Sequence, residues 1–189
     1  MLYWSKLRYA GHKRGCEKML RLRTYKNSDA RKIVSWLTEE EAFQKWAAGR
    51  LHWPLSEEQF QHFAAAQLEE ERTYLVTALD ERGEPVGFLC MTKADYEKNS
   101  IHFCYIIVGS RSRGKGYGTQ MLQLAVRYAV ELLQMQRITL RVFENNQAAR
   151  RCYQKVGFRE EAYYPMAMEY KGARWSAYDM VYQVPLRSI

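Results

Sequence analysis

The sequence predicts an α+β domain in which early helices precede an antiparallel hairpin, one βαβ crossover and a final hairpin. An apolar run over residues 103–108 ends abruptly in a segment with four glycines, residues 109–118. Apolar residues then recur at helical spacing up to residue 132, and a β-prone run follows at residues 137–143. A strand, a helix and a strand in this order predict parallel pairing with a right-handed connection.

The part of the chain before the crossover is expected to begin with one strand and three helices. Residues 20–25 alternate apolar and basic side chains, which is typical of a half-buried strand. Asn27 or Ser28 can cap the first helix, and residues 39–48 form a second helical stretch that stops at a glycine. The third helix is expected after Ser56-Glu-Glu-Gln59, because this is a capping-box pattern.

Hairpins are expected before and after the crossover. Residues 73–79 and 85–92 are apolar and β-prone, and the polar segment 80–84 between them predicts a hairpin turn. The remaining elements expected from the pattern are a short helix at residues 146–156, ended by Gly157, and closing strands at residues 158–168 and 175–184.

Length and composition favour one domain. The chain has 189 residues, of which 47% are hydrophobic and 14% aromatic, enough for one sizeable core but short for two. The sequence contains no run of 18 apolar residues and no signal-peptide hydrophobic region, so we expect a cytoplasmic protein without a membrane partner. The four cysteines lack C-x-x-C spacing and the four histidines form no ligand pair, so we expect reduced thiols and no metal.

The formal charge of +8 raises the question of nucleic-acid binding. Residues 1–18 hold five basic residues and one acidic residue, so half of the excess charge lies there. This segment shows no periodicity and is expected to be a flexible basic extension, with a single folded domain over residues 19–189. The basic residues of that domain form no stripe interleaved with aromatics, so we expect no nucleic-acid partner.

Three phosphate-binding patterns compete for the glycine-rich segment. Gly109 to Gly116 reads G-x-x-x-x-G-K-G, without the Ser or Thr hydroxyl that holds magnesium in nucleoside triphosphatases. The glycines at 114, 116 and 118 do not give the G-x-G-x-x-G spacing of a dinucleotide fold. The pattern that fits is [QR]-x-x-G-x-[GA], over Arg113 to Gly118. Glycines that open a helix let backbone N–H groups and the helix dipole bind phosphate.

Placed after a strand and before a helix, this pattern resembles the acyl-CoA-binding loop of the GNAT superfamily of N-acyltransferases. Downstream, Asn146-x-x-Ala149-x-x-x-Tyr153 followed by Gly157-Phe158 resembles the second signature of the same superfamily. The resemblance covers residues 19–189. It implies the GNAT fold, a mixed central sheet of about six to seven strands flanked by helices, in which the βαβ crossover carries the pyrophosphate loop.

The resemblance also implies acetyl-CoA, or another acyl-CoA, as the cosubstrate. Backbone N–H groups of the loop would hold the pyrophosphate, with added charge from Arg113 and Lys115. The backbone of Ile107 and Val108 would pair with the pantetheine arm, and Asn146 would bond that arm or cap its own helix. The implied binding residues are Ile107, Val108, Arg113, Gly114, Lys115, Gly116, Tyr117, Gly118, Thr119, Asn146 and Ala149.

The reaction implied by the resemblance is direct transfer of the acyl group to a primary amine. Tyr153 matches the family's thiolate-protonating tyrosine and is expected to be the general acid. His102 is expected to be the general base, because arylalkylamine acetyltransferases carry a histidine at the matching spacing, although Cys104 stands where they have another histidine. Strand alternation would place His102 on the same face as Cys104, Ile106 and Val108. Core packing is the alternative role for both residues.

The acceptor is expected to be a small-molecule or peptide amine that enters between the early helices and the final hairpin. Aromatic residues there suggest an acceptor with an apolar or cationic portion, while core packing explains the same rings. These residues are Trp53, Tyr163, Tyr164, Tyr170 and Trp175. The family also leaves a homodimer open. The alternative to an enzyme is a catalytically degenerate module on the same fold that binds acyl-CoA or nucleic acid.

Overall fold

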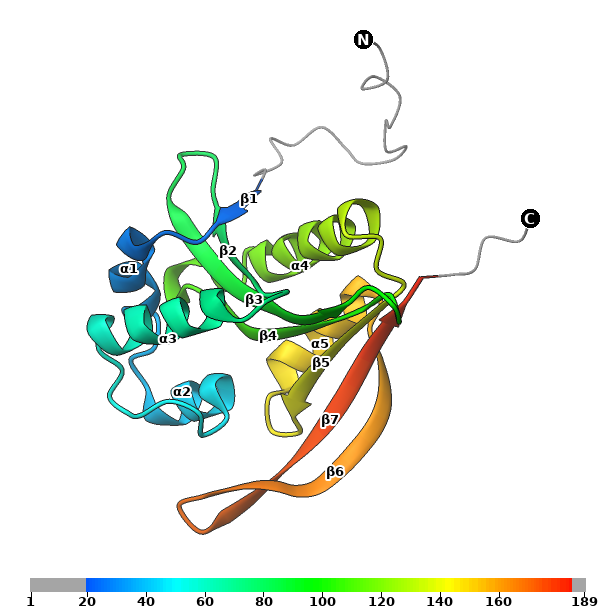
Figure 1. Ribbon diagram of the computed structural model, residues 1–189. Helices are drawn as coiled ribbons and strands as arrows, with labels where there is room; N and C mark the ends of the chain where they lie inside the picture. The colour runs from blue at the N-terminus through cyan, green and yellow to red at the C-terminus, as the bar shows by residue number, and fades with distance from the viewer. Residues whose placement is uncertain (1–19, 185–189) are drawn as a thin grey trace, which may run out of the picture.

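One mixed sheet of seven strands runs through the part of the chain that the computed structural model describes, residues 20–184 (Figure 1). The strands are β1 (Arg21–Thr24), β2 (Tyr74–Leu79), β3 (Pro85–Asp95), β4 (Ser100–Val108), β5 (Arg137–Phe143), β6 (Arg159–Tyr170) and β7 (Ala173–Gln183). Their order across the sheet is β1-β2-β3-β4-β5-β7-β6, and only β4 and β5 pair in parallel. The basic extension expected at residues 1–18 lies outside the described residues.

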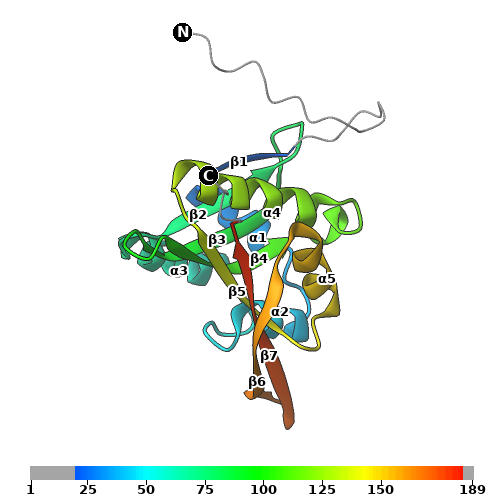
Figure 2. The same ribbon diagram turned by 90° about the vertical axis from the view of Figure 1, so that its right-hand side faces the viewer.

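Helices cover both faces of this sheet (Figures 1 and 2). They are α1 (Ala30–Val34), α2 (Glu40–Ala47), α3 (Glu57–Glu69), α4 (Tyr117–Arg127) and α5 (Gln147–Val156). One core lies under α1 to α3 and a second, larger core lies under α4 and α5. In the described range, no helix is long and apolar enough to cross a membrane. The mixed sheet of seven strands with its helical crossover confirms the fold class expected from the sequence.

Local sequence signals set several of these boundaries. The side chain of Ser56 accepts a hydrogen bond from the Gln59 N–H at 3.1 Å, and the Gln59 side chain accepts one from the Ser56 N–H at 3.2 Å. This reciprocal pair satisfies two N–H groups that the first turn of α3 would leave free, as the capping-box pattern predicts. Helix α5 ends at Gly157, whose φ of 110° is accessible to glycine without steric cost.

The parallel strands β4 and β5 separate before either of them ends. Their pairing covers only Ser100–Phe103 against Arg137–Leu140. Past this point β4 continues to Val108 and β5 to Phe143 without pairing to each other, so their backbone N–H and C=O groups face a gap. The loop after β4 and the first turn of α4 border this gap. The fold therefore opens its sheet at the glycine-rich segment.

A β-bulge at Tyr105 changes which side chains of β4 face each core. Tyr105 has a φ of 50°, and the register between β3 and β4 shifts by one residue there. Phe103 before the bulge and Ile106 and Val108 after it all pack against the core under α4 and α5, whereas His102 lies on the opposite face. The expectation that His102 shares a face with Ile106 and Val108 is therefore wrong, because the extra residue inverts the alternation.

The helix that follows the loop also departs from regular spacing at its end. Residues Tyr128–Leu132 form a π-helical turn after α4. The helical pattern predicts that Leu132 lies on the buried face, but its side chain is 69% exposed, while Leu122 and Val126 are buried instead. A π-helical turn adds a residue per turn and rotates the positions that follow it, which moves Leu132 out of the core.

One buried carboxylate joins the first strand to the second. Asp29 is only 3% exposed and accepts hydrogen bonds from Arg23 (2.7 Å to each oxygen), from the Lys26 N–H (3.1 Å) and from the Thr77 hydroxyl (2.9 Å). Burial alone would raise the pKa of Asp29, but these hydrogen bonds and the Arg23 charge together lower it below its usual value. The folded state therefore prefers the ionised form.

We predict that Asp29→Asn lowers the free energy of unfolding by about 2–3 kcal/mol, because it leaves the Arg23 guanidinium without its counterion and four hydrogen-bond donors with a weaker acceptor. Urea unfolding at pH 7 measures this. The difference from wild type should shrink as the pH falls through the lowered pKa of Asp29, since the wild-type carboxylate then takes up a proton. Glu81→Gln, at an exposed position in the β2–β3 turn, is the control. An equal loss in both variants would contradict the prediction.

Candidate functional site

The loop between β4 and α4 is shaped as an anion-binding turn. Gly114 and Gly116 have φ values of 74° and 81°, and a Cβ at either position would meet no atom within 4 Å. The Gln120 N–H bonds to the Gly116 carbonyl at 3.1 Å, so the N–H groups of the first turn before Gln120 have no helical partner. The Arg113 side chain donates to the Val108 carbonyl at 3.1 Å and ties the loop to the strand end. Backbone donors and the helix dipole thus point into open space.

A groove of about 580 Å³ runs from this loop into the gap between β4 and β5. It brings together ten of the residues expected to bind the cosubstrate or act as the acid, namely Ile107, Val108, Arg113, Gly114, Gly116, Gly118, Thr119, Asn146, Ala149 and Tyr153. Two of the expected residues have side chains elsewhere: Lys115 is exposed beside the loop, and Tyr117 is buried in the core under α4.

The side chain of Asn146 fills one of the two roles expected for it, the capping of its own helix. Its Oδ1 accepts a hydrogen bond from the Ala149 N–H at 3.3 Å, so it caps α5. The same residue lines the groove together with Ala149. The first turns of α5 and of α4 both border the groove.

Tyr153 projects from α5 into the groove and is 7% exposed. Its ring lies 6.2 Å from that of Phe158, and both belong to the core under α4 and α5. Burial raises the pKa of the Tyr153 phenol above its ordinary value, since a phenolate would lose its hydration there. Tyr153 therefore holds its proton at neutral pH.

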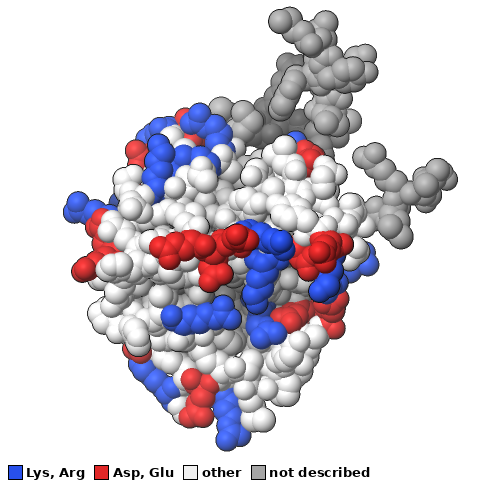
Figure 3. Space-filling view, in the orientation of Figure 1, with Lys and Arg blue, Asp and Glu red and all other residues white. Residues whose placement is uncertain are grey.

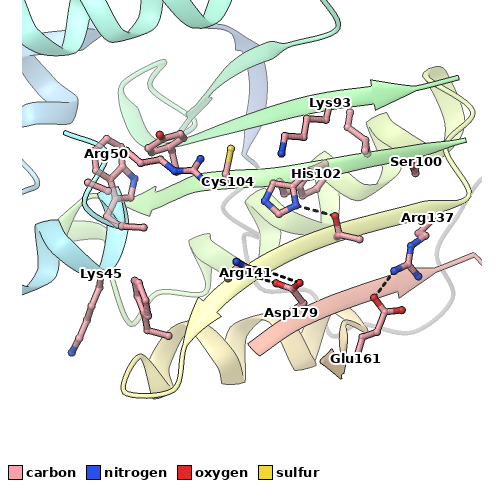
Figure 4. A pocket seen from close by; sticks show the side chains of 18 residues that line it. Lys45, Arg50, Lys93, Ser100, His102, Cys104, Arg137, Arg141, Glu161 and Asp179 are labelled. Atoms are coloured by element: carbon pink, nitrogen blue, oxygen red, sulfur yellow. Dashed lines mark hydrogen bonds and ion pairs between the residues drawn. The ribbon is translucent and has the colours of Figure 1, made fainter. Parts of the chain in front are cut away.

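A second cavity, of about 480 Å³, lies on the other face of the sheet beside α2 (Figure 4). His102 lines it, and its Nδ1 lies 2.9 Å from the Thr139 hydroxyl on β5. Burial, followed by the positive charge of Lys93, lowers the pKa of His102 from 6.5 to about 4. The imidazole is therefore neutral at pH 7, and its second nitrogen can accept a proton when Nδ1–H donates to Thr139.

The two cavities meet at the β4 bulge. Both are lined by Cys104 and Tyr105 of β4, by Arg141 of β5 and by Trp46 of α2. The two cavities therefore adjoin near the point where β4 and β5 separate. Tyr153 lies on the groove side of this junction and His102 on the other side.

Sequence reasoning missed most of the charged lining of the second cavity. Arg50, Lys93, Arg141 and Asp179 come from four different elements or turns and belong to no motif. Strand alternation even gives the wrong face for Lys93. The aromatic residues expected near the acceptor take other places: none of Trp53, Tyr163, Tyr164, Tyr170 and Trp175 lines either cavity.

Those rings pack with one another or lie on the surface. Trp175 is buried against Phe143 and Tyr170, with centroid distances of 5.4 Å and 5.0 Å. Trp53 packs on Phe43, and Tyr163 is exposed on β6. Packing therefore accounts for most of the five aromatic residues that were expected near the acceptor.

The cysteines of the described segment are free thiols. Cys90 is buried, and Cys104 and Cys152 are half-buried. Cys90 and Cys104 lie opposite each other on β3 and β4, and the contact with Cys90 lowers the pKa of Cys104 while raising that of Cys90. Within residues 20–184 no three His, Cys, Asp or Glu side chains are grouped as metal ligands.

Solved structures with this fold include spermidine N-acetyltransferase from Vibrio cholerae in complex with CoA and spermine. It has a TM-score of 0.76 at 20% sequence identity, over 87% of this chain and 95% of that one. A chimera of the Vibrio cholerae enzyme SpeG with hSSAT gives a TM-score of 0.75 at 21% identity, with the same coverage of both chains. At this level of identity the similarity shows a common fold.

Curated relatives match a shorter part of the chain. The spermine/spermidine N(1)-acetyltransferase of Bacillus subtilis (strain 168) is 42% identical over 90 residues, which is 45% of this chain and 59% of that protein. The match thus spans about three fifths of the length of this relative. The family model described as "Acetyltransferase (GNAT) domain" matches residues 19–159, most of the chain. On this match, with both signature motifs placed in one groove, the chain belongs to the GNAT acetyltransferase family.

Proposed function

We propose that this chain transfers an acetyl group from acetyl-CoA to a primary amine, by direct attack of the amine on the thioester. The observation that carries the proposal is the junction of the two cavities at Cys104 and Tyr105. It gives a thioester and an amine separate approaches to one point. A protonated phenol lies on the thioester side, at Tyr153, and a neutral imidazole lies on the amine side, at His102.

One part of the groove suits the pyrophosphate of acetyl-CoA, and another part suits its pantetheine arm. The open space around Gly114 and Gly116 and the free N–H groups of the first turn of α4 fit a pyrophosphate. At Ile107 and Val108, β4 pairs with β3 but has no partner strand on its β5 side, where backbone groups could bond to the amides of the pantetheine arm. In this arrangement the pantetheine arm would pair with β4 along the stretch where β5 no longer does.

Tyr153 would supply the proton for the leaving thiolate. As the amine nitrogen bonds to the thioester carbon, the carbon–sulfur bond breaks and the sulfur keeps the electron pair. A phenol held in its protonated form by burial can donate to that sulfur, which makes CoA a better leaving group.

His102 would accept the proton that the amine gives up. Its neutral state at pH 7 leaves a ring nitrogen free, and Thr139 fixes the orientation of the ring. With a pKa of about 4 the imidazole is a weak base, so it suits relay of the proton to water better than permanent retention of it.

The relatives' names make polyamines the first acceptors to test. The Bacillus subtilis relative is named for spermine and spermidine, and the Vibrio cholerae structure holds spermine. A release assay for free CoA, with acetyl-CoA and a panel of amines, tests the proposed function directly. Binding of acetyl-CoA without release of CoA for any amine would instead support a catalytically silent acyl-CoA-binding module.

We predict that Gly116→Asp abolishes stabilisation by acetyl-CoA, because it places a carboxylate where the loop would hold phosphate. At 100 times its Kd, acetyl-CoA should stabilise the wild-type protein by about 2.7 kcal/mol, measured as a thermal shift. Gly172→Asp is the matched control, since Gly172 has a φ of 77° and open space around its Cβ but lies in the β6–β7 turn. If Gly116→Asp keeps the full thermal shift, the loop does not bind the pyrophosphate.

We predict that Tyr153→Phe lowers kcat by about 10²-fold or more, with little change in the KM for acetyl-CoA, because the variant keeps the ring and loses the proton. Steady-state kinetics of CoA release measure both constants. Tyr182→Phe is a suitable control, because its ring also lies beside Phe158, at 5.8 Å, but lines neither cavity. An equal fall in kcat for both variants would assign Tyr153 to core packing.

We predict that His102→Gln lowers kcat/KM at pH 7 by about 10²-fold and removes an inflection near pH 4 from the pH profile. The inflection should be present in the wild type because protonation of His102 below its lowered pKa removes the base. Circular dichroism at each pH separates this effect from unfolding. If the rate and the profile are unchanged, the base lies elsewhere or the amine arrives already neutral.

A further inference from the structure

We propose that the acceptor is a primary amine that also carries an anionic group, a carboxylate or a phosphate, and that Arg50 and Lys93 bind this group. The inference deepens the proposed function and rests on it, because it takes the second cavity as the acceptor site. It also departs from the polyamines after which the relatives are named.

The lining of the second cavity is predominantly basic. Five basic and two acidic residues border it, a formal excess of three positive charges. These residues are Lys45, Arg50, Lys93, Arg137, Arg141, Glu161 and Asp179. In the space-filling view, Lys and Arg side chains gather near the middle of this face, with Asp and Glu beside them (Figure 3).

Both acidic residues of the cavity are already paired. Asp179 accepts two hydrogen bonds from Arg141, at 2.6 Å and 2.9 Å, and Glu161 forms an ion pair with Arg137. These pairs leave no carboxylate of the lining free to hold the second or third ammonium of a polyamine. The site thus lacks the feature that a polycationic acceptor requires.

Two of the five basic residues have no counterion in the described part of the chain. Lys45 pairs with Glu41 at 2.7 Å, whereas neither Arg50 nor Lys93 has a carboxylate of residues 20–184 within ion-pairing distance. Figure 4 shows both side chains directed toward the space in front of Cys104 and His102. A bound anionic group would supply the missing counterion.

Irregular backbone directs both cations into the cavity. Lys93 has a φ of 54° at a bulge in β3, where the register against β4 shifts between Thr92 and Asp95. Met91 packs in the core under α4 and α5, so regular alternation would turn Lys93, two residues further on, toward that core as well. The bulge places it in the second cavity instead. A non-glycine residue with positive φ carries strain that is commonly retained at functional sites.

Irregular backbone also positions Arg50. Helix α2 ends in two consecutive left-handed residues, Ala48 with a φ of 49° and Gly49 with a φ of 72°. The Arg50 N–H then bonds back to the Ala47 carbonyl at 3.0 Å, which holds the turn against the end of the helix. The chain reverses within this turn, and Arg50 faces the sheet.

The titration of His102 reports the field that these cations create. After burial, Lys93 is the largest influence that lowers the pKa of His102, and Arg141 and Arg50 act in the same direction against Asp179. A positive field of this kind repels added ammonium groups and attracts carboxylate or phosphate. It also favours the neutral form of an acceptor amine, which is the form that attacks.

The test compares matched acceptors that share an amine and differ in the anionic group. Suitable pairs are O-phosphoethanolamine with ethanolamine and β-alanine with propylamine, and spermidine and spermine are assayed beside them. Release of CoA from acetyl-CoA gives kcat/KM for each amine. We expect the anionic member of at least one pair to exceed its partner and both polyamines by about tenfold or more, equivalent to about 1.4 kcal/mol. Comparison of the phosphate pair with the carboxylate pair shows which of the two anionic groups the site prefers.

Variants connect the preference to the two cations. Lys93→Gln and Arg50→Gln should each reduce the ratio of kcat/KM between the anionic and neutral members by about tenfold, mainly through KM, with an unchanged KM for acetyl-CoA. Lys98→Gln removes an exposed lysine on the neighbouring turn that pairs with Asp95 at 3.6 Å and lines neither cavity, so it should keep the ratio. Added salt should also weaken the preference.

Calorimetry on the CoA-bound protein separates this inference from the proposed function, since it measures acceptor binding without turnover. Tighter binding of the anionic amines than of spermidine, lost in Lys93→Gln, would support the inference even if no amine were acetylated. Spermidine or spermine as the best acceptor, with Lys93→Gln leaving the order of preference unchanged, would overturn it. The same holds if the anionic and neutral partners bind and react equally.

Discussion

The candidate site depends on one constraint, the loss of pairing between two adjacent parallel strands. Strands β4 and β5 share hydrogen bonds only as far as Phe103 and Leu140. Beyond this point a sheet would normally carry on, and each strand is left with backbone groups that need partners. The bulge at Tyr105 lies two residues further along β4 and turns that strand's later side chains over. The groove and its junction with the second cavity lie at this opening.

The sequence contains enough information to predict the fold and the groove. Glycines at a strand-to-helix junction, the Asn-x-x-Ala-x-x-x-Tyr spacing and the capping box at Ser56 each act through local backbone geometry, which a short motif can specify. For this reason the loop, the start of α5 and Tyr153 meet in one groove as expected. These features require only neighbours in the chain.

The second cavity could not be predicted in the same way. A bulge adds one residue to a strand and requires no particular residue type. The residues with positive φ at the two bulges are Tyr105 and Lys93, and neither is the glycine or asparagine that would indicate a positive φ. Alternation therefore fails from that point, as it does for the face of His102. The charge of the cavity also depends on which ion pairs form, and Arg141 with Asp179 joins residues 38 positions apart. Such pairs depend on the register of the sheet, which a local sequence motif does not specify.

The two cavities reach their junction from opposite faces of the sheet, and this geometry has a consequence for the order of events in a catalytic cycle. Each cavity also has lining residues that the other lacks, so a ligand in the groove would not fill the second cavity. Both reactants can then be held at once before any bond changes. In such a ternary complex the proposed direct attack of the amine on the thioester would need no covalently modified enzyme. On the proposed function, one product could then leave while the other is still bound, so the two products would not have to leave in a fixed sequence.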